Sequence, residues 1–281
     1  MDLNEKKQLQ ITACKVRMGI VESTHSAKAG HPGGSLSATE IFTYLYFKEM
    51  NVDPKNPKWE NRDRFVLSKG HTAPGLYATL AHRGFFPVED LKTLRRIDSY
   101  LQGHPNMNSV PGVDMSTGSL GQGISCAAGM ALGLKHQGNP ARVYTLLGDG
   151  EIQEGQVWEA CMLAAHYKLD NFVVIVDNNG LQIDGDIAKV MSPYPIVDKL
   201  AAFGFHVEAI DGHDFDQIEA ALHTAKATKG QPTAIVMTTT KGKDVSFMEN
   251  DAGWHGKAPN DAEYAQAMAE LNAILSELEG K

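Results

Sequence analysis

The sequence has 281 residues, of which 42% are hydrophobic and 21% charged, with a formal net charge of −8. The apolar content excludes a disordered chain, and the acidic balance disfavours binding to nucleic acid through its phosphates. A chain of this length can bury a large core and fits one large domain or two modest ones.

The segments that would direct the chain to a membrane or to secretion are not evident. Residues 1–20 lack the apolar stretch of a secretory signal, and the longest clean apolar run, Phe172–Val176, is too short to cross a bilayer. Cys14, Cys126 and Cys161 are scattered, which disfavours a disulfide framework or a zinc ribbon. We therefore expect a globular, cytoplasmic protein that associates with neither membrane nor nucleic acid.

Apolar periodicity and the placement of glycine and proline predict the elements in chain order. The first part reads as helices over 5–27 and 37–50, a polar connection, a short strand over 65–67 and a helix over 120–137. Short β-branched runs then alternate with helices: strands at 143–147, 172–176, 205–210 and 234–238, helices to about 168, at 197–203 and at 216–228. Such runs are typical of a mostly parallel sheet with helices on both faces, so we expect an α/β fold.

The ends of the chain complete this organisation. The helix at the start forms an amino-terminal arm, and the last helix carries Tyr264, Leu271 and Leu278 on one stripe that must dock on the rest. No linker stands out, which predicts a single domain over residues 1–281.

Polar turns follow two predicted strands that are adjacent in the chain. Gly148-Asp149-Gly150 ends one, and Asp177-Asn178-Asn179-Gly180 ends the next. Ligands of parallel sheets bind beyond the carboxyl ends of strands, where this spacing brings Asp149 and Asn179 side by side. Their oxygens suit Mg²⁺ or Ca²⁺ rather than zinc, and glycine-flanked amides suit a diphosphate. A lone Gly-Asp-Gly is more often a plain turn with an N-cap, but the paired turns favour the metal.

Four of the 11 histidines lie in glycine-rich loops: His31, His71, His104 and His255. A lone loop histidine is usually solvated or bonded to a backbone carbonyl. Four of them predict a cleft lined by imidazoles that titrate near neutral pH and bind a polyhydroxylated substrate. Their spacing does not resemble a zinc signature.

Taken together, these segments resemble the thiamine-diphosphate-dependent transketolase family. The motifs that carry the resemblance are Ala29-Gly30-His31-Pro32-Gly33-Gly34, Asp63-Arg64-Phe65-Val66-Leu67-Ser68-Lys69-Gly70-His71, Thr117-Gly118-Ser119-Leu120-Gly121-Gln122-Gly123, the two polar turns, and Trp254-His255-Gly256-Lys257. The match runs from Ile20 to about Pro259 and corresponds to the family's amino-terminal, diphosphate-binding half.

The resemblance implies roles for individual residues. It implies that Asp149, Asn179 and the carbonyl of Leu181 hold Mg²⁺, with Ca²⁺ or Mn²⁺ as substitutes. The remaining cofactor contacts that it implies are Lys69, His71, Gly118, Ser119, Leu120, Gly150, Asn179, Ile183 and Lys241, and the catalytic histidines are His31, His104 and His255. Glu154 and Glu159 would lie near a dimer contact, although a solvated helix face is an almost equal alternative.

The resemblance implies that the family's reaction needs residues from domains that this chain lacks. The glutamate that pairs with the cofactor's pyrimidine and the arginines that grip the substrate phosphate belong to other domains, which nothing after Pro259 resembles. We therefore expect a carboxy-terminal partner subunit with the pyrimidine-binding domain, in an α2β2 transketolase acting on sugar phosphates in the pentose phosphate pathway. A truncated longer enzyme is the alternative origin of the chain.

The sequence is also compatible with different functions. The alternative to the transketolase hypothesis is another thiamine diphosphate enzyme, such as one resembling deoxyxylulose-phosphate synthase or one with an unusual acceptor. A non-catalytic cofactor-binding module is a further alternative, against which the intact Asp149, Asn179 and four loop histidines argue, and a metal-dependent hydrolase is a more remote one.

Overall fold

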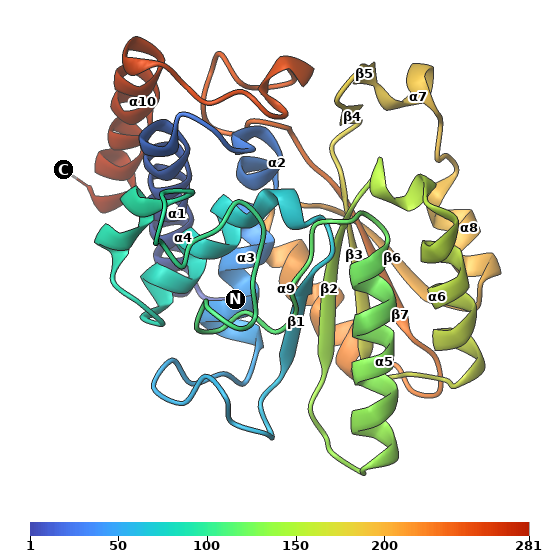
Figure 1. Cartoon of the computed structure of the whole chain (residues 1–281). Helices are drawn as coiled ribbons and strands as arrows, with labels where there is room; N and C mark the ends of the chain where they lie inside the picture. The colour runs from blue at the N-terminus through green and yellow to red at the C-terminus, as the bar shows by residue number, and fades with distance from the viewer. Residues whose placement is uncertain (281) are drawn as a thin grey trace.

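The computed structural model describes residues 1–280, and a five-stranded parallel sheet in the order β1-β2-β3-β7-β6 forms its centre. The strands are β1 (Arg64–Leu67), β2 (Val143–Gly148), β3 (Phe172–Asn178), β6 (His206–Asp211) and β7 (Thr233–Thr238). All neighbouring strands are parallel, so their carboxyl ends share one edge (Figure 1). The predicted parallel sheet is confirmed.

Helices cover both faces of this sheet. On β3, Val173 and Ile175 belong to one core, whereas Val174 and Val176 belong to the other. The first core is covered by α1 (Leu3–Ala27), α3 (Thr39–Tyr44), α4 (Ala73–Arg83), α9 (Phe215–Ala227) and α10 (Asp261–Glu279), and the second by α5 (Gln122–His136), α6 (Gly155–His166) and α8 (Ile196–Ala202). Because β2, β3 and β7 are buried on both sides, their sequences read as continuous apolar runs, whereas β6 at the edge of the sheet is only partly buried.

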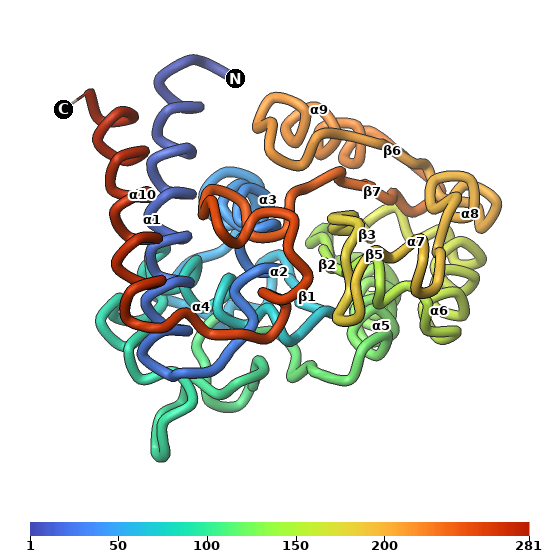
Figure 2. Tube along the Cα trace, turned by 90° about the horizontal axis from the view of Figure 1, so that it is seen from above, coloured from blue at the N-terminus to red at the C-terminus, as the bar shows by residue number. Residues whose placement is uncertain are grey.

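The last helix, α10, docks on the first. Asn260 and Glu263 form a capping box at its start, and Leu271 on its buried stripe has no exposed surface. Figure 2 shows α10 alongside α1 over most of their lengths. The expectation that the terminal apolar stripe packs against the chain is confirmed.

The predicted helix over 37–50 is confirmed over residues 39–49, but its predicted start is wrong. The chain instead forms α2 (Pro32–Ser37), α3 and a π-helical turn over Leu45–Glu49, with Ala38 outside helical geometry at φ −97° and ψ 9°. Glycine disfavours helices, which hid α2, but tertiary packing overrides that preference here. A Cβ on Gly33 would lie 2.8 Å from the Trp254 carbonyl oxygen, so only glycine permits this close approach.

Several smaller elements were not predicted. The helix α4 follows the Gly70–Thr72 turn and tolerates Pro74 because proline fits the first turn of a helix. After β3, a hairpin of β4 (Leu181–Gln182) and β5 (Gly185–Asp186) leads into α7 (Ile187–Val190). Short helical turns also occupy Val88–Thr93, Glu151–Gln153 and Ala252–Trp254.

Candidate functional site

A cleft of about 380 Å³ lies where β2 and β3 end. It is lined by the two polar turns, the loops before α2 and α5, and the segment after β7. Its lining residues include His31, Lys69, His71, Gly118, Leu120, Asp149, Gly150, Glu151, Asn179, Leu181, Ile183, Lys241 and His255. The fold thus gathers most residues singled out in the sequence, whereas His104 and Ser119 lie outside this lining.

Asp149 lies at the bottom of this cleft and is nearly inaccessible, with 2% of its surface exposed. Its Oδ1 accepts a hydrogen bond from the Gly150 amide at 2.8 Å, and its Oδ2 accepts one from the Gly180 amide at 2.6 Å. Burial, reinforced by the nearby charge of Asp177, raises the pKa of Asp149 to about 6. The carboxylate therefore lies where a cation would stabilise it.

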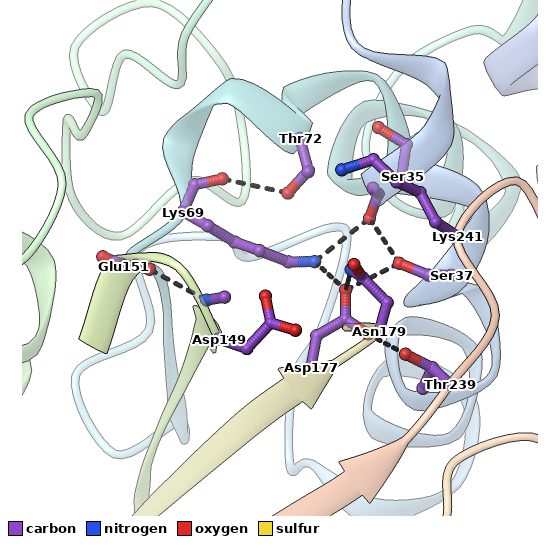
Figure 3. Close-up of polar contacts among 12 residues, drawn as sticks. Ser35, Ser37, Lys69, Thr72, Asp149, Glu151, Asp177, Asn179, Thr239 and Lys241 are labelled. Atoms are coloured by element: carbon purple, nitrogen blue, oxygen red, sulfur yellow. Dashed lines mark hydrogen bonds and ion pairs between the residues drawn. The ribbon is translucent and has the colours of Figure 1, made fainter. Parts of the chain in front are cut away.

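Asp177, the one acidic residue of β3, organises the polar groups under the cleft. It accepts hydrogen bonds from the Ser37 hydroxyl at 2.6 Å and the Asn179 amide at 3.1 Å, and it pairs with Lys69 and Thr239 (Figure 3). Burial favours the neutral acid, but Lys69 and the hydroxyl donors together hold the pKa of Asp177 below its usual value. The Asn179 amide nitrogen is thereby committed, and its oxygen accepts from the Leu181 amide at 3.1 Å.

Two buried lysines reach the same cleft. Lys69 is 1% exposed and pairs with Asp177, whereas Lys241, at 2% exposed, contacts only neutral groups. Its Nζ donates to the Leu181 carbonyl at 3.2 Å and lies 3.1 Å from Nδ1 of His255. Burial lowers the pKa of Lys241 to about 8, so an anion in the cleft would stabilise its charge.

The four predicted histidines form one cluster. The ring centroid of His31 lies 5.2 Å from that of His71, 5.5 Å from that of His255 and 6.4 Å from that of His104. The His71 and His255 rings are 5.0 Å apart. Loops that follow α1, β1 and β7 therefore bring imidazoles from distant parts of the sequence to one side of the cleft.

The expectation that these imidazoles titrate near neutral pH is wrong for the chain as it stands. Burial, assisted by nearby cationic groups, lowers the pKa of His31 to about 4 and that of His255 to about 3. The pKa values of His71 and His104 are lowered as well, again chiefly by burial. These side chains are therefore neutral at pH 7 and act as hydrogen-bond donors and acceptors rather than as cations.

Sequence reasoning missed two buried carboxylates, Asp177 and Glu151. Each lies within three residues of a strand end, in the same turns that drew attention to Asp149 and Asn179. That position is a signal that sequence reasoning alone could have used. Their partners, among them Ser37 and Ser68, are distant in sequence and become evident only in the fold.

The comparison with known families matches residues 8–273 to the model described as "Transketolase, thiamine diphosphate binding domain". The chain belongs to the transketolase family. It is 45% identical to the 6-deoxy-6-sulfo-D-fructose transketolase subunit SqwG of Clostridium sp. (strain MSTE9), over 94% of this chain and 96% of that relative. It is 42% identical to one subunit of the apulose-4-phosphate transketolase of Phocaeicola vulgatus, with 96% of each chain covered.

Solved transketolases share this fold. Transketolase from Campylobacter jejuni superposes with a TM-score of 0.88 and 33% identity over 99% of this chain but only 47% of that one. The chain likewise covers 44% of human transketolase, at 41% identity. It is a transketolase-type enzyme subunit that corresponds to the amino-terminal part of these longer transketolases.

The cleft fits thiamine diphosphate with a divalent metal ion. Asp149 offers a buried carboxylate, and the Asn179 amide and the Leu181 carbonyl add oxygen atoms nearby, which is a donor set suited to Mg²⁺. Lys69 and Lys241 supply positive charge for a diphosphate. This donor set contains one carboxylate. It therefore differs from a site built from three or more His, Cys, Asp or Glu side chains, and no such group occurs within residues 1–280.

Two further observations concern the surface of this transketolase subunit. Glu154 and Glu159 are both exposed in the chain, so neither is buried without a partner chain. Across the described residues 1–280, no helix is long and apolar enough to cross a membrane.

Proposed function

We propose that the chain supplies the diphosphate-binding half of a transketolase that transfers a two-carbon ketol unit from a ketose phosphate to an aldose phosphate. One observation supports this most directly: a buried carboxylate, Asp149, and a buried ammonium, Lys241, face the same cleft with hydrogen bonds only to neutral groups. A metal ion bound to a diphosphate would stabilise both charges at once.

Asp149, Asn179 and the Leu181 carbonyl would hold Mg²⁺. The diphosphate would contact Gly150 and His71, with the ammonium groups of Lys69 and Lys241 nearby. Gly118, Ser119 and Leu120 would cradle the cofactor, and Leu120 and Ile183 would cover its ring; these two apolar side chains are 38% and 68% exposed. Thiamine diphosphate, when bound, supplies the electron sink that allows a bond beside a ketone carbonyl to break.

The histidines would hold the sugar and move its protons. Because the Lys241 ammonium donates to Nδ1 of His255, the proton of the neutral imidazole lies on Nε2. His255 is then a donor through Nε2, suited to a sugar hydroxyl or a carbonyl oxygen. His31 has a buried Nδ1 without a partner among residues 1–280, and His104 lies beside it at the edge of the cluster.

The rest of the active site would come from a partner subunit. This chain spans less than half of the matched human and Campylobacter jejuni transketolases, and its similar-length relatives are named as subunits. We therefore propose a carboxy-terminal partner that carries the pyrimidine-binding domain, in an α2β2 assembly in the cytoplasm. The two subunits would act on sugars with a terminal anion, as the relatives named for apulose 4-phosphate and a sulfofructose do.

Reconstitution tests this proposal. The chain, a candidate partner, thiamine diphosphate and Mg²⁺ are mixed with xylulose 5-phosphate and an aldose phosphate, and release of glyceraldehyde 3-phosphate is measured. We expect turnover only when all components are present. Full activity of this chain alone would contradict the split site, and hydrolysis without a thiamine requirement would favour a metal-dependent hydrolase instead.

A further inference from the structure

Glu151 is a buried carboxylate to which the proposed chemistry gives no role. It follows Gly150 directly, starts the helical turn Glu151–Gln153, and is 2% exposed. Figure 3 draws it in the same close-up as Asp149, and it belongs to the lining of the cleft. A buried carboxylate is costly unless its oxygens are hydrogen-bonded, so its partners determine whether it can remain ionised there.

Three hydrogen-bond donors converge on the Glu151 carboxylate. Oε1 accepts from the Ser68 hydroxyl at 2.5 Å and from the Gly121 amide at 3.0 Å, and Oε2 accepts from the Gly148 amide at 3.0 Å. These donors belong to three separate segments: the end of β1, the turn before α5 and the last residue of β2. Ser68 in turn accepts from the Ile124 amide at 3.2 Å, which extends the network to the first turn of α5.

Burial raises the pKa of Glu151, whereas its three hydrogen-bond donors favour the ionised carboxylate. The two amides and the committed Ser68 hydroxyl all present hydrogens, so both oxygens of Glu151 must act as acceptors. A glutamine has the same shape but would place an amide N–H against one of these donors. A lost acceptor in a buried position costs more than the hydrogen bond itself, because the donor remains unpaired.

The segments that Glu151 joins lie on two sides of the cleft. The Gly148 amide precedes Asp149, and the Gly121 amide follows Leu120, whose side chain lines the cleft. Gly121 has φ +81°, and a Cβ there would lie 2.8 Å from Cβ of Glu154, so this turn is packed closely against the start of α6. The carboxylate therefore fixes one side of the cleft relative to the other.

We propose that Glu151 is a positioning residue for the cofactor: it holds the Leu120–Gly121 turn and the Gly148–Gly150 turn at the separation that thiamine diphosphate requires. This inference rests on the proposed function, in that the cofactor occupies this cleft. Glu151 acts through the backbone of these turns and itself contacts neither metal nor substrate.

The test compares Glu151→Gln with Glu49→Gln. Glu49 is a matched control because it is also buried and accepts two hydrogen bonds, from the Tyr144 hydroxyl and Lys226, both at 2.8 Å, outside the cleft. For each protein, the dissociation constant for thiamine diphosphate with Mg²⁺ is measured by calorimetry, together with urea unfolding without cofactor. We expect Glu151→Gln to weaken cofactor binding about tenfold or more, whereas Glu49→Gln leaves it within about twofold.

A purely structural role would give a different result. Unchanged cofactor affinity in Glu151→Gln, or equal weakening in both variants, overturns the proposal. In the reconstituted enzyme, a positioning role predicts a higher concentration of thiamine diphosphate for half-maximal rate, with most of the rate recovered at saturation. A rate that stays low at saturation, with unchanged cofactor affinity, also contradicts it.

A second variant covers the case in which Glu151→Gln does not fold. Ser68→Ala keeps the carboxylate and removes one donor, so we expect a smaller loss of affinity of about threefold. No loss in this variant overturns the proposal when Glu151→Gln cannot be measured. If the unchanged protein with its partner fails to bind thiamine diphosphate, the proposed cofactor site is wrong. If the unchanged protein and the variants all bind it normally, the cofactor site stands and only the positioning role of Glu151 is wrong.

Discussion

Charged side chains are buried at both edges of the parallel sheet, but the partners of these charges differ between the two edges. At the amino edge, Glu49 meets Lys226 and Tyr144, and Asp114 meets Arg62 and the Phe65 amide. At the carboxyl edge, Asp149 and Lys241 are buried as deeply but bond only to neutral groups. The first set of charges is satisfied within the chain, and the second set is suited to a ligand.

This contrast separates groups that serve the fold from groups that serve the site. Charges that are paired within the chain contribute to stability, whereas buried charges without a charged partner reduce it until a ligand compensates them. Asp177 belongs to the first class although it lies at the carboxyl edge, because Lys69 is its direct partner. The distinction therefore follows the pairing of each group and not simply its position.

The largest expected effect concerns Asp149. Replacing it with asparagine removes the one carboxylate of the proposed metal site, so we expect affinity for thiamine diphosphate in Mg²⁺ to fall about 100-fold. The free energy of unfolding without cofactor should stay within about 1 kcal/mol, since relief of the buried charge offsets the hydrogen bond lost at Gly180. Calorimetry and urea unfolding measure the two quantities, and a strong destabilisation would place Asp149 with the structural charges.

The reverse result is expected at the amino edge. Glu49→Gln should lower the free energy of unfolding by about 1–2 kcal/mol, because the buried carboxylate loses its ion pair with Lys226. Urea unfolding of the chain without cofactor measures this loss. A variant as stable as the unchanged protein would contradict the assignment of Glu49 to the fold.

The same contrast explains which parts of the fold and of the site could be predicted from the sequence alone. The strands β2, β3 and β7 were predictable because burial on both faces produces unbroken apolar runs, and Asp149 and Asn179 because they follow two such runs. The partners of Asp177 and Glu151 were not, since Ser37 and Ser68 approach them only through tertiary packing. The lowered pKa values of the histidines were missed for a similar reason: burial by distant loops leaves no trace in the local sequence.

Lys241 offers a smaller effect at the carboxyl edge. Lys241→Met keeps most of the length of the side chain but removes the buried ammonium, so affinity for thiamine diphosphate should fall about tenfold. Without cofactor, the free energy of unfolding should not fall and should rise by up to about 1 kcal/mol, because the environment that lowers the Lys241 pKa disfavours its charge. A parallel loss of stability and affinity would instead indicate that Lys241 supports the fold through the Leu181 carbonyl and His255.

The smallest effect is a dependence of stability on pH that arises in the histidine cluster. In the unfolded chain these imidazoles take up protons below about pH 6.5, whereas burial holds the pKa of His31 at about 4 and that of His255 at about 3 in the folded chain. The unfolded state therefore binds more protons in this window, and His31 and His255 should each lower the free energy of unfolding by about 1 kcal/mol between pH 7 and pH 5.5. His255→Gln should reduce this dependence, whereas His206→Gln, which removes a histidine that pairs with Glu208 outside the cleft, serves as its control. Equal dependence in the unchanged protein and His255→Gln would show that the acid sensitivity arises outside the cleft, and NMR titration of the imidazole protons locates it directly.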